Sequence, residues 1–157
     1  FNSDKSLLDI KPQLMNFMES GGNVIIQYNT SRNLDVNKFS PYPFTLSRNR
    51  VSQENAPVRI INSKHPVLNY PNKITLEDFN GWVQERGLYF PNSWSNEFET
   101  VISSNDKGES PNNGGILISK VGDGYFVYTS YSWFRQLPAG VSGAYKLFTN
   151  LISLGKK

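Results

Sequence analysis

The sequence contains no cysteine and a single histidine, and both scarcities limit the chemistry that the chain can carry out. The lack of cysteine excludes disulfides, thiolate nucleophiles, cysteine-ligated zinc and iron–sulfur clusters. Charged residues make up 18% of the chain, below the usual share of about a quarter. The formal net charge of +3 is small and scattered, so we expect neither nucleic acid nor an anionic membrane as a partner. No apolar run approaches the roughly 20 residues of a membrane-spanning helix.

The residues that are present indicate one folded domain. Hydrophobic residues make up 38% and aromatic residues 13% of the 157 residues, which is enough to build one sizeable core. We therefore expect residues 1–157 to form a single domain. The chain starts at Phe1 with neither an initiator methionine nor a signal peptide, so we expect it to be the C-terminal fragment of a longer product.

The first thirty residues have the pattern of a helix followed by a buried strand. Apolar residues at helical spacing form a stripe that we expect to face the core: Leu7, Ile10, Leu14 and Phe17, widened by Leu8, Met15 and Met18. A Gly-Gly pair ends this helix, and the uninterrupted apolar run at 23–28 predicts a fully buried strand. A helix leading into such a strand is half of a βαβ unit, so we expect the strand before the helix to lie upstream of Phe1.

The middle of the chain is richer in loops. Residues 29–57 show little periodicity and predict a long irregular excursion. Short strands are predicted at 44–46, 58–61, 88–90 and 99–104. A capping box of Thr75 and Asp78 predicts a short helix. The residues of this helix expected to face inward are Leu76, Phe79, and Trp82 or Val83.

The last third predicts a hairpin and a long helix. A glycine-rich turn at 121–124 predicts a β-hairpin over 116–129, and a clean apolar stripe predicts a helix over 141–154. We predict a three-layer α/β fold in which the 23–28 strand is central and has parallel neighbours. The hairpin then lies toward one edge of the sheet, and the C-terminal helix packs on one face.

Two segments, 81–91 and 129–140, concentrate aromatic and charged residues. Their candidate ligand-binding residues are Trp82, Glu85, Arg86, Tyr89, Tyr131, Trp133, Arg135 and Gln136. Aromatic rings beside arginine and glutamate suit a sugar, which stacks on a ring and accepts paired hydrogen bonds. We expect Glu85, Arg86 and Arg135 to lie close together, with Glu85 paired to one arginine. The commoner explanation for such residues is structural, with aromatics in the core and an ion pair that closes a loop.

Other polar residues carry weaker signals. His65 has no cysteine to activate and no second histidine with which to hold a metal, so we favour a turn residue over a general base. Asp106 and Glu109 lack the spacing of a calcium loop, which favours a solvated loop. Ser130 and Ser132 do not lie in a hydrolase nucleophile motif. We therefore name no catalytic residue, no metal ligand and no cofactor for this domain.

Several motifs together resemble one family. These are GWVQERGLYFP (81–91), NDKGESP (105–111) and the run from YFVYTSYSWFRQLPAG to the C-terminal helix, with GGNVIIQYN and HPVLNYPNKITLEDF in agreement. The chain resembles, over nearly its whole length, the C-terminal class I glutamine amidotransferase-like domain of bacterial LmbE/PIG-L-type N-acetylglucosaminyl deacetylases, chiefly of Bacteroidetes. The resemblance implies a flavodoxin-like sheet, a start just after an early strand, and a metal-dependent deacetylase domain upstream in the same chain.

The chain departs from that family's catalytic pattern. Class I amidotransferases use a cysteine with a later histidine and glutamate, but this chain has no cysteine and no histidine after His65. The deacetylase metal motifs are also absent. The resemblance therefore implies a non-catalytic accessory domain that binds carbohydrate or organises subunits.

Two alternatives stay open. The first is a hydrolase-type enzyme that uses Glu85 with Asp106 or Glu109. The second is a purely structural oligomerisation domain whose exposed aromatics form an interface between copies. We expect a glycan and a second copy as possible partners, and we favour a periplasmic or extracellular location over a cytoplasmic one.

Overall fold

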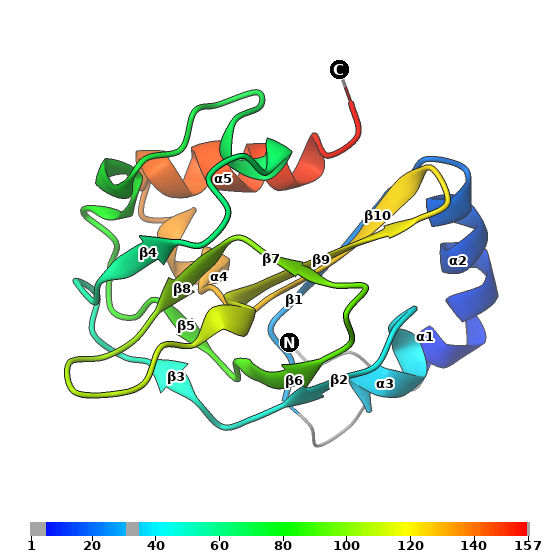
Figure 1. The fold of residues 1–157 in the computed structure, drawn as a ribbon, viewed down its shortest axis with the longest axis horizontal. Helices are drawn as coiled ribbons and strands as arrows, with labels where there is room; N and C mark the ends of the chain where they lie inside the picture. The colour runs from blue at the N-terminus through cyan, green and yellow to red at the C-terminus, as the bar shows by residue number, and fades with distance from the viewer. Residues whose placement is uncertain (1–5, 31–34, 157) are drawn as a thin grey trace.

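The computed structural model describes residues 6–30 and 35–156, which form a mixed α/β fold (Figure 1). Its α-helices are α1 (Ser6–Asp9), α2 (Lys11–Glu19), α3 (Val36–Phe39), α4 (Trp133–Gln136) and α5 (Ser142–Ile152). Single 3₁₀ turns form η1 (Pro66–Leu68), η2 (Leu76–Phe79) and η3 (Asn113–Gly115). None of the described helices is long and apolar enough to cross a bilayer.

The strands form one four-stranded sheet and three strand pairs. They are β1 (Asn23–Gln27), β2 (Phe44–Leu46), β3 (Arg50–Val51), β4 (Val58–Ile60), β5 (Gly87–Leu88), β6 (Pro91–Trp94), β7 (Glu99–Thr100), β8 (Ile102–Ser104), β9 (Ile116–Val121) and β10 (Gly124–Thr129). The order in the large sheet is β1-β10-β9-β7. Strand β1 runs parallel to β10, and the other pairs of this sheet are antiparallel. The strand pairs are β2-β6, β3-β5 and β4-β8.

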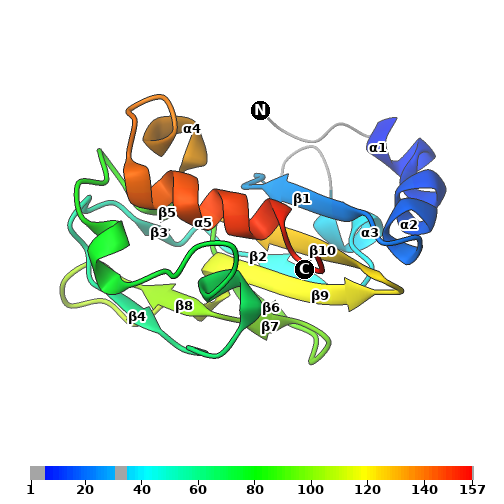
Figure 2. The ribbon, with the colours of Figure 1, turned by 90° about the horizontal axis from the view of Figure 1, so that it is seen from above.

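Two hydrophobic clusters lie on the two faces of the large sheet. One contains Ile25 and Val127 with the inner face of α5, and the other contains Val24 and Phe126 with the inner face of α2. Alternate residues of β1 and β10 thus point to opposite clusters, as the period of a strand requires. Figure 1 shows α5 and α2 on opposite sides of these strands. Figure 2, seen from above, shows α5 crossing over the sheet.

The predicted places of two elements in the sheet are wrong. The strand predicted to be central, β1, lies at one edge of the four-stranded sheet, and the hairpin of β9 and β10, predicted near an edge, lies in the middle. Strand β1 is also half-buried, with Gln27 exposed, and not fully buried as predicted. Helices pack against both of its faces, which explains its apolar composition, but coverage of the faces does not fix the number of neighbouring strands. A single parallel neighbour, β10, replaces the several that we expected.

The first helices were predicted at the right place but with too wide a buried stripe. The chain is helical over α1 and α2, with Pro12 in the first turn of α2. Ile10 is 43% exposed and Phe17 is 53% exposed, so two residues expected to face the core point outward. The second hydrophobic cluster instead uses Leu14, Met15 and the fully buried Met18.

The remaining helix predictions had mixed outcomes. Helix α5 packs on one face of the sheet as predicted. The backbone N–H of Thr75 donates to the Asp78 carboxylate at 2.8 Å, which confirms the capping box. The helix that follows is only the single turn η2, and Leu76 is exposed, contrary to prediction. Gly143 in the first turn of α5 lies against this turn, where a Cβ would approach the Asp78 carbonyl oxygen to 1.8 Å.

Most strand predictions are confirmed at shorter lengths. The predicted strands at 44–46, 58–61 and 99–104 correspond to β2, β4 and the pair β7 and β8. The one predicted at 88–90 is displaced to β5. The structure adds β3 and β6, which lack a clear apolar alternation.

Helix α5 should contribute a large share of the stability through its buried face. Replacing Leu147, which is fully buried, by alanine should lower the free energy of unfolding by about 2–4 kcal/mol through lost burial and a residual cavity. Thr149→Ala on the exposed side of the same helix is the control and should change it by less than about 0.5 kcal/mol. Urea denaturation followed by circular dichroism measures both, and equal losses would contradict the assignment of the buried face.

Candidate functional site

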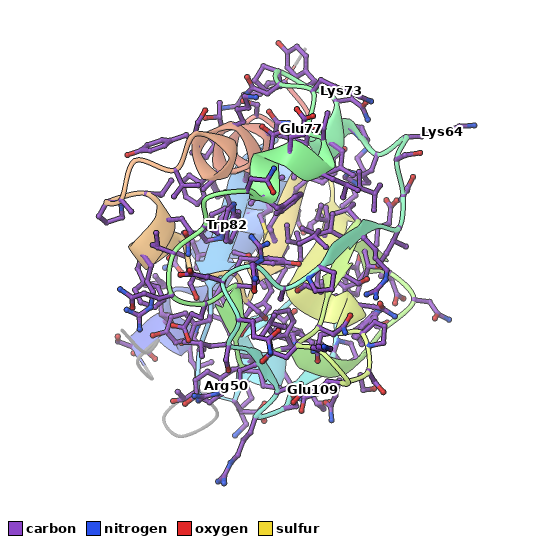
Figure 3. The ribbon with its side chains drawn as sticks, turned by 90° about the vertical axis from the view of Figure 1, so that its left-hand side faces the viewer. Arg50, Lys64, Lys73, Glu77, Trp82 and Glu109 are labelled. Carbon is purple, nitrogen blue, oxygen red and sulfur yellow. The ribbon has the colours of Figure 1, made fainter. Side chains whose placement is uncertain are left out.

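Three of the predicted ligand-binding aromatics lie in the hydrophobic core. Trp82, Tyr131 and Trp133 are buried and pack against one another, with ring centroids 5.7–6.1 Å apart. Their burial contradicts a role in ligand binding and agrees with the structural explanation given above, in which the aromatics lie in the core. Figure 3 shows Trp82 among densely packed side chains, whereas Lys64 extends outward. The sequence alone could not distinguish core aromatics from exposed ones here, because the elements that bury these rings are far away in the chain.

Arg86 is also buried, and its guanidinium bonds to backbone carbonyls. Its Nε and Nη2 donate to the Ala56 oxygen at 3.1 and 2.9 Å, and its Nη1 donates to the Phe79 oxygen. The charge lies 5.5 Å from the centre of the Trp82 ring, a favourable cation–π distance. Burial lowers the pKa of this guanidinium, although Tyr131 and Glu54 oppose the shift. Arg86 thus joins two loops and offers no surface to a ligand.

Gln136 positions the segment that carries Glu85. Its buried side-chain oxygen accepts from the Val83 N–H at 2.8 Å. Its side-chain nitrogen donates to the Val83 oxygen at 2.9 Å and to the Glu85 oxygen at 3.1 Å. The amide therefore holds the backbone on both sides of Gln84, and the role of Gln136 is structural.

The other three predicted residues come together at the surface with two that the sequence analysis missed. Glu85, Tyr89 and Arg135 lie with Tyr28 and Phe134, and we call these five residues the carboxyl-end cluster. The Arg135 Nε donates to a Glu85 carboxylate oxygen at 2.7 Å, which confirms the predicted pairing of Glu85 with an arginine. Tyr28 stacks on Tyr89 with centroids 6.0 Å apart and contacts Phe134 at 5.3 Å. The Arg135 guanidinium lies 5.0 Å from the centre of the Phe134 ring.

The parallel pairing of β1 and β10 explains why this cluster forms. Tyr28 directly follows β1, and the segment with Phe134 and Arg135 follows β10. Because parallel strands end at the same edge of a sheet, these residues emerge side by side. All five side chains are half-buried, so each keeps part of its surface accessible.

The loop of 84–89 adds backbone strain to the cluster. Gln84 and Tyr89 have φ values of +64° and +54°, in the left-handed region that non-glycine residues rarely adopt. Such conformations persist where the surroundings fix them, and they gather at functional sites. Here the Gln84 N–H donates to the Glu54 carboxylate at 2.9 Å, and the Tyr89 carbonyl accepts from the Ser130 hydroxyl at 3.4 Å.

The buried Tyr128 lies beneath the carboxyl-end cluster and contacts its backbone. The Tyr128 hydroxyl accepts from the Asn29 N–H at 3.1 Å and faces the Tyr89 carbonyl at 3.5 Å. Burial raises the pKa of Tyr128 far above its ordinary value, and burial raises the pKa of Tyr131 to about 12. Both phenols are therefore neutral at physiological pH and serve as fixed hydrogen-bonding groups.

The residues given weaker roles have structural partners. The Nδ1 of His65 accepts from the Val67 N–H at 3.1 Å, so this buried histidine caps η1, in accord with a turn residue. Both carboxylate oxygens of Asp106 accept backbone N–H groups, from Ser52 and Gln53. Among the residues that the structure describes, no group of three or more histidine, cysteine or acidic side chains could hold a metal ion.

A separate polar cavity of about 460 Å³ lies between η2 and the start of α5. Lys146 and Asp78 form an ion pair of 2.8 Å on its wall. Burial alone would raise the pKa of Asp78, but hydrogen bonds from Lys146 and Thr75 lower it overall. These groups satisfy one another, and the cavity adds nothing to the carboxyl-end cluster.

Two of the cluster's residues, Tyr28 and Phe134, were missed because their place depends on how distant strands pair. Tyr28 is the last residue of the strand predicted at 23–28, Phe134 follows the predicted hairpin of 116–129, and the carboxyl ends of parallel strands meet at one edge of a sheet. The signal needed was the pairing of the 23–28 strand with the second strand of the hairpin, which no local pattern supplies.

Comparison with models of known protein families gives no match, and comparison with curated protein sequences gives none. The resemblance to the deacetylase-associated domains thus stays a prediction carried by sequence motifs. The function is inferred below from the geometry of the carboxyl-end cluster.

Arg86 should be far more important for stability than Arg135. In Arg86→Lys the ammonium cannot reach both the Ala56 and Phe79 carbonyls, which leaves a buried acceptor unsatisfied and should cost about 2–4 kcal/mol. The matched control Arg135→Lys affects a pair in which the arginine is 34% exposed, and it should cost less than about 1 kcal/mol. Chemical denaturation of both variants tests the order, and a larger loss in the control would refute the structural role of Arg86.

His65 should make the protein less stable at mildly acidic pH. Burial lowers the pKa of His65 below its ordinary value, with Glu99 opposing, so the unfolded chain binds this proton more readily than the folded one. The free energy of unfolding should therefore decrease as the pH falls below about 6.5, by at most about 1.4 kcal/mol per pH unit for one group. His65→Asn keeps a side-chain acceptor but cannot titrate, so it should lose this part of the pH dependence. Denaturation of both proteins between about pH 4.5 and 8 measures the free energy of unfolding at each pH. If this free energy falls equally with pH in the two proteins, the interpretation is wrong.

Proposed function

We propose that this chain is a non-catalytic carbohydrate-binding domain, accessory to an N-acetylglucosaminyl deacetylase of the LmbE/PIG-L type, with the carboxyl-end cluster as its binding surface. The observation that carries the proposal is the stack of Tyr28 on Tyr89, half-buried beside the Arg135–Glu85 ion pair. Tyrosine rings held in place by neighbours lose little entropy on binding, and the apolar face of a sugar packs well against them.

The ion pair supplies the polar half of such a surface. Arg135 uses its Nε for Glu85, which leaves its two terminal nitrogens to donate elsewhere. The planar guanidinium suits adjacent hydroxyl or amide oxygens of an N-acetylated sugar. Because Glu85 is anchored through its backbone by Gln136, the pair is already in place before a ligand arrives.

The proposed fold is a variant of the flavodoxin-like arrangement. The parallel pair β1 and β10, with α2 on one face and α5 on the other, supports a layered helix–sheet–helix core. The antiparallel β9 and β7 depart from an all-parallel sheet of that type.

An accessory role fits the residues of the sequence. A glutaminase triad of the class I type cannot be assembled from a chain without cysteine. Binding in the same polypeptide as a catalytic domain would raise the local concentration of a weakly bound glycan near that domain. Modest affinity from two rings and one ion pair would then be sufficient.

The enzymatic alternative has less support. Glu85 is held by Arg135, and both oxygens of Asp106 are engaged by backbone N–H groups. Asp106 therefore has a structural role in its loop, and one oxygen of Glu85 is engaged by Arg135, so no observation supports these two carboxylates as an acid–base pair.

Binding of a soluble oligosaccharide of N-acetylglucosamine tests the proposal. Titration followed by calorimetry should give saturable binding to the chain. Tyr28→Ala should weaken it by roughly fivefold, corresponding to about 1 kcal/mol for one lost aromatic contact. Arg135→Ala should weaken it by a similar factor, because it removes the polar donors.

The control is Tyr70→Ala, which removes an exposed tyrosine from the loop between η1 and η2. This variant should bind like the unaltered protein. Absence of saturable binding to N-acetylglucosamine and glucose oligomers alike, with folded protein, would refute the carbohydrate-binding function.

A further inference from the structure

Strand β1 leaves one edge of the large sheet open. It pairs with β10 on one side, and among the described residues no strand pairs with its other side. Sheet edges are normally protected by charged residues, proline or bulges, because unpaired N–H and C=O groups are a template for another strand. The sequence of β1, Asn-Val-Ile-Ile-Gln, contains none of these protections.

The hydrogen bonds of β1 identify which backbone groups face outward. The Gly22 carbonyl accepts from the Tyr125 N–H of β10. Backbone groups of successive residues in a parallel strand alternate in direction, so those of Asn23, Ile25 and Gln27 point away from β10. In agreement, the Gln27 carbonyl accepts from a side chain, that of Asn29 at 2.9 Å.

Apolar surface flanks this edge. A groove of about 620 Å³ runs beside the start of β1, lined in part by Phe17, Gly22, Ile25 and Ile152. Phe17 is 53% exposed and Ile152 is 47% exposed, although both lie on helices that pack against the sheet. Phe17, which the sequence pattern assigned to the core, thus lies in a groove beside the open strand, whose lining also includes the polar Ser20 and Asn23 and the charged Lys156.

We propose that β1 pairs antiparallel with β1 of a second copy of this chain, which joins the two four-stranded sheets into one. The strand is self-complementary. Polar residues stand at both ends and three apolar residues lie between, so a twofold axis at Ile25 places Ile25 opposite its equivalent and Asn23 opposite Gln27.

The pairing satisfies the open edge without opposing charges. The outward N–H groups of Asn23, Ile25 and Gln27 and the carbonyls of Asn23 and Ile25 gain partners in this register, and the Gln27 carbonyl, which already accepts from the Asn29 side chain, accepts a second bond. The two Ile25 side chains meet on the face covered by α5, and Val24 of each copy meets Ile26 of the other on the opposite face. No charged residue lies in β1 to repel its equivalent across the axis. This dimer does not rest on the proposed sugar binding. It competes for the edge of β1 with the strand that the sequence predicts before the first helix, and the hydrogen-exchange experiment below distinguishes the two.

Sedimentation equilibrium of the 157-residue protein over a range of concentrations tests the dimer. We expect a reversible monomer–dimer equilibrium. Gln27→Pro should weaken the dimer at least tenfold, because it removes an N–H that points to the partner while leaving the bonds to β10 intact. Gln27 is exposed, so the monomer should stay folded. The matched control Gln27→Thr keeps the N–H and should dimerise like the unaltered protein.

Hydrogen exchange gives a second readout that does not require a variant. The amides of Ile25 and Gln27 should be protected at high protein concentration and exchange quickly on dilution, whereas those of β10 should stay protected at both. A protein that is monomeric at every concentration, a dimer unaffected by Gln27→Pro, or concentration-independent protection of these amides would each overturn the proposal. The last result would mean that another segment of the polypeptide covers the edge.

Discussion

The buried guanidinium of Arg86 holds together segments that are far apart in the sequence. Its side chain bonds to the carbonyls of Ala56 and Phe79, and its backbone N–H donates to the Val51 oxygen. Its own carbonyl accepts from the Ser132 N–H, next to the buried Tyr131 and Trp133. A charge taken out of water is tolerated only when its donors are used, and here the carbonyls of two loops fulfil that requirement. The irregular middle of the chain thereby acquires a defined path over the core.

Arg86 also separates the two kinds of residue in the segment 81–91, which contributes both to the carboxyl-end cluster and to the hydrophobic core. Glu85 and Tyr89 stand close to Arg86 in sequence, but they point to the surface while Arg86 points inward. The Leu88 N–H donates to the Ser130 oxygen, and the Ser132 N–H donates to the Arg86 oxygen. These two backbone bonds join the segments 81–91 and 129–140. The side chains of Gln136 and Arg135 then fix the Glu85 backbone and carboxylate. A polar surface is thus built directly on a rigid aromatic core.

The sequence predicted local elements better than their neighbours in space. The opening helix, the hairpin of β9 and β10, helix α5 and the Glu85–Arg pair follow from period, turn chemistry and charge. The edge position of β1 and the burial of Trp82 and Trp133 depend on which distant segments pack against them, and no local pattern carries that information. An apolar run reports that both faces of a strand are covered, but not how many strands flank it. An aromatic beside an arginine has the same local signature in a core as on a binding surface.

The alternation of β1 and β10 between two hydrophobic clusters has a consequence for cooperativity. Ile25 and Val127 belong to the cluster beneath α5, whereas their neighbours Val24 and Phe126 belong to the cluster beneath α2. Loss of either cluster would remove the support from one face of the same two strands and expose the bonds between them. We therefore expect the two sides of the sheet to unfold together, and local opening to occur in loops such as 105–111, none of whose residues belongs to either cluster.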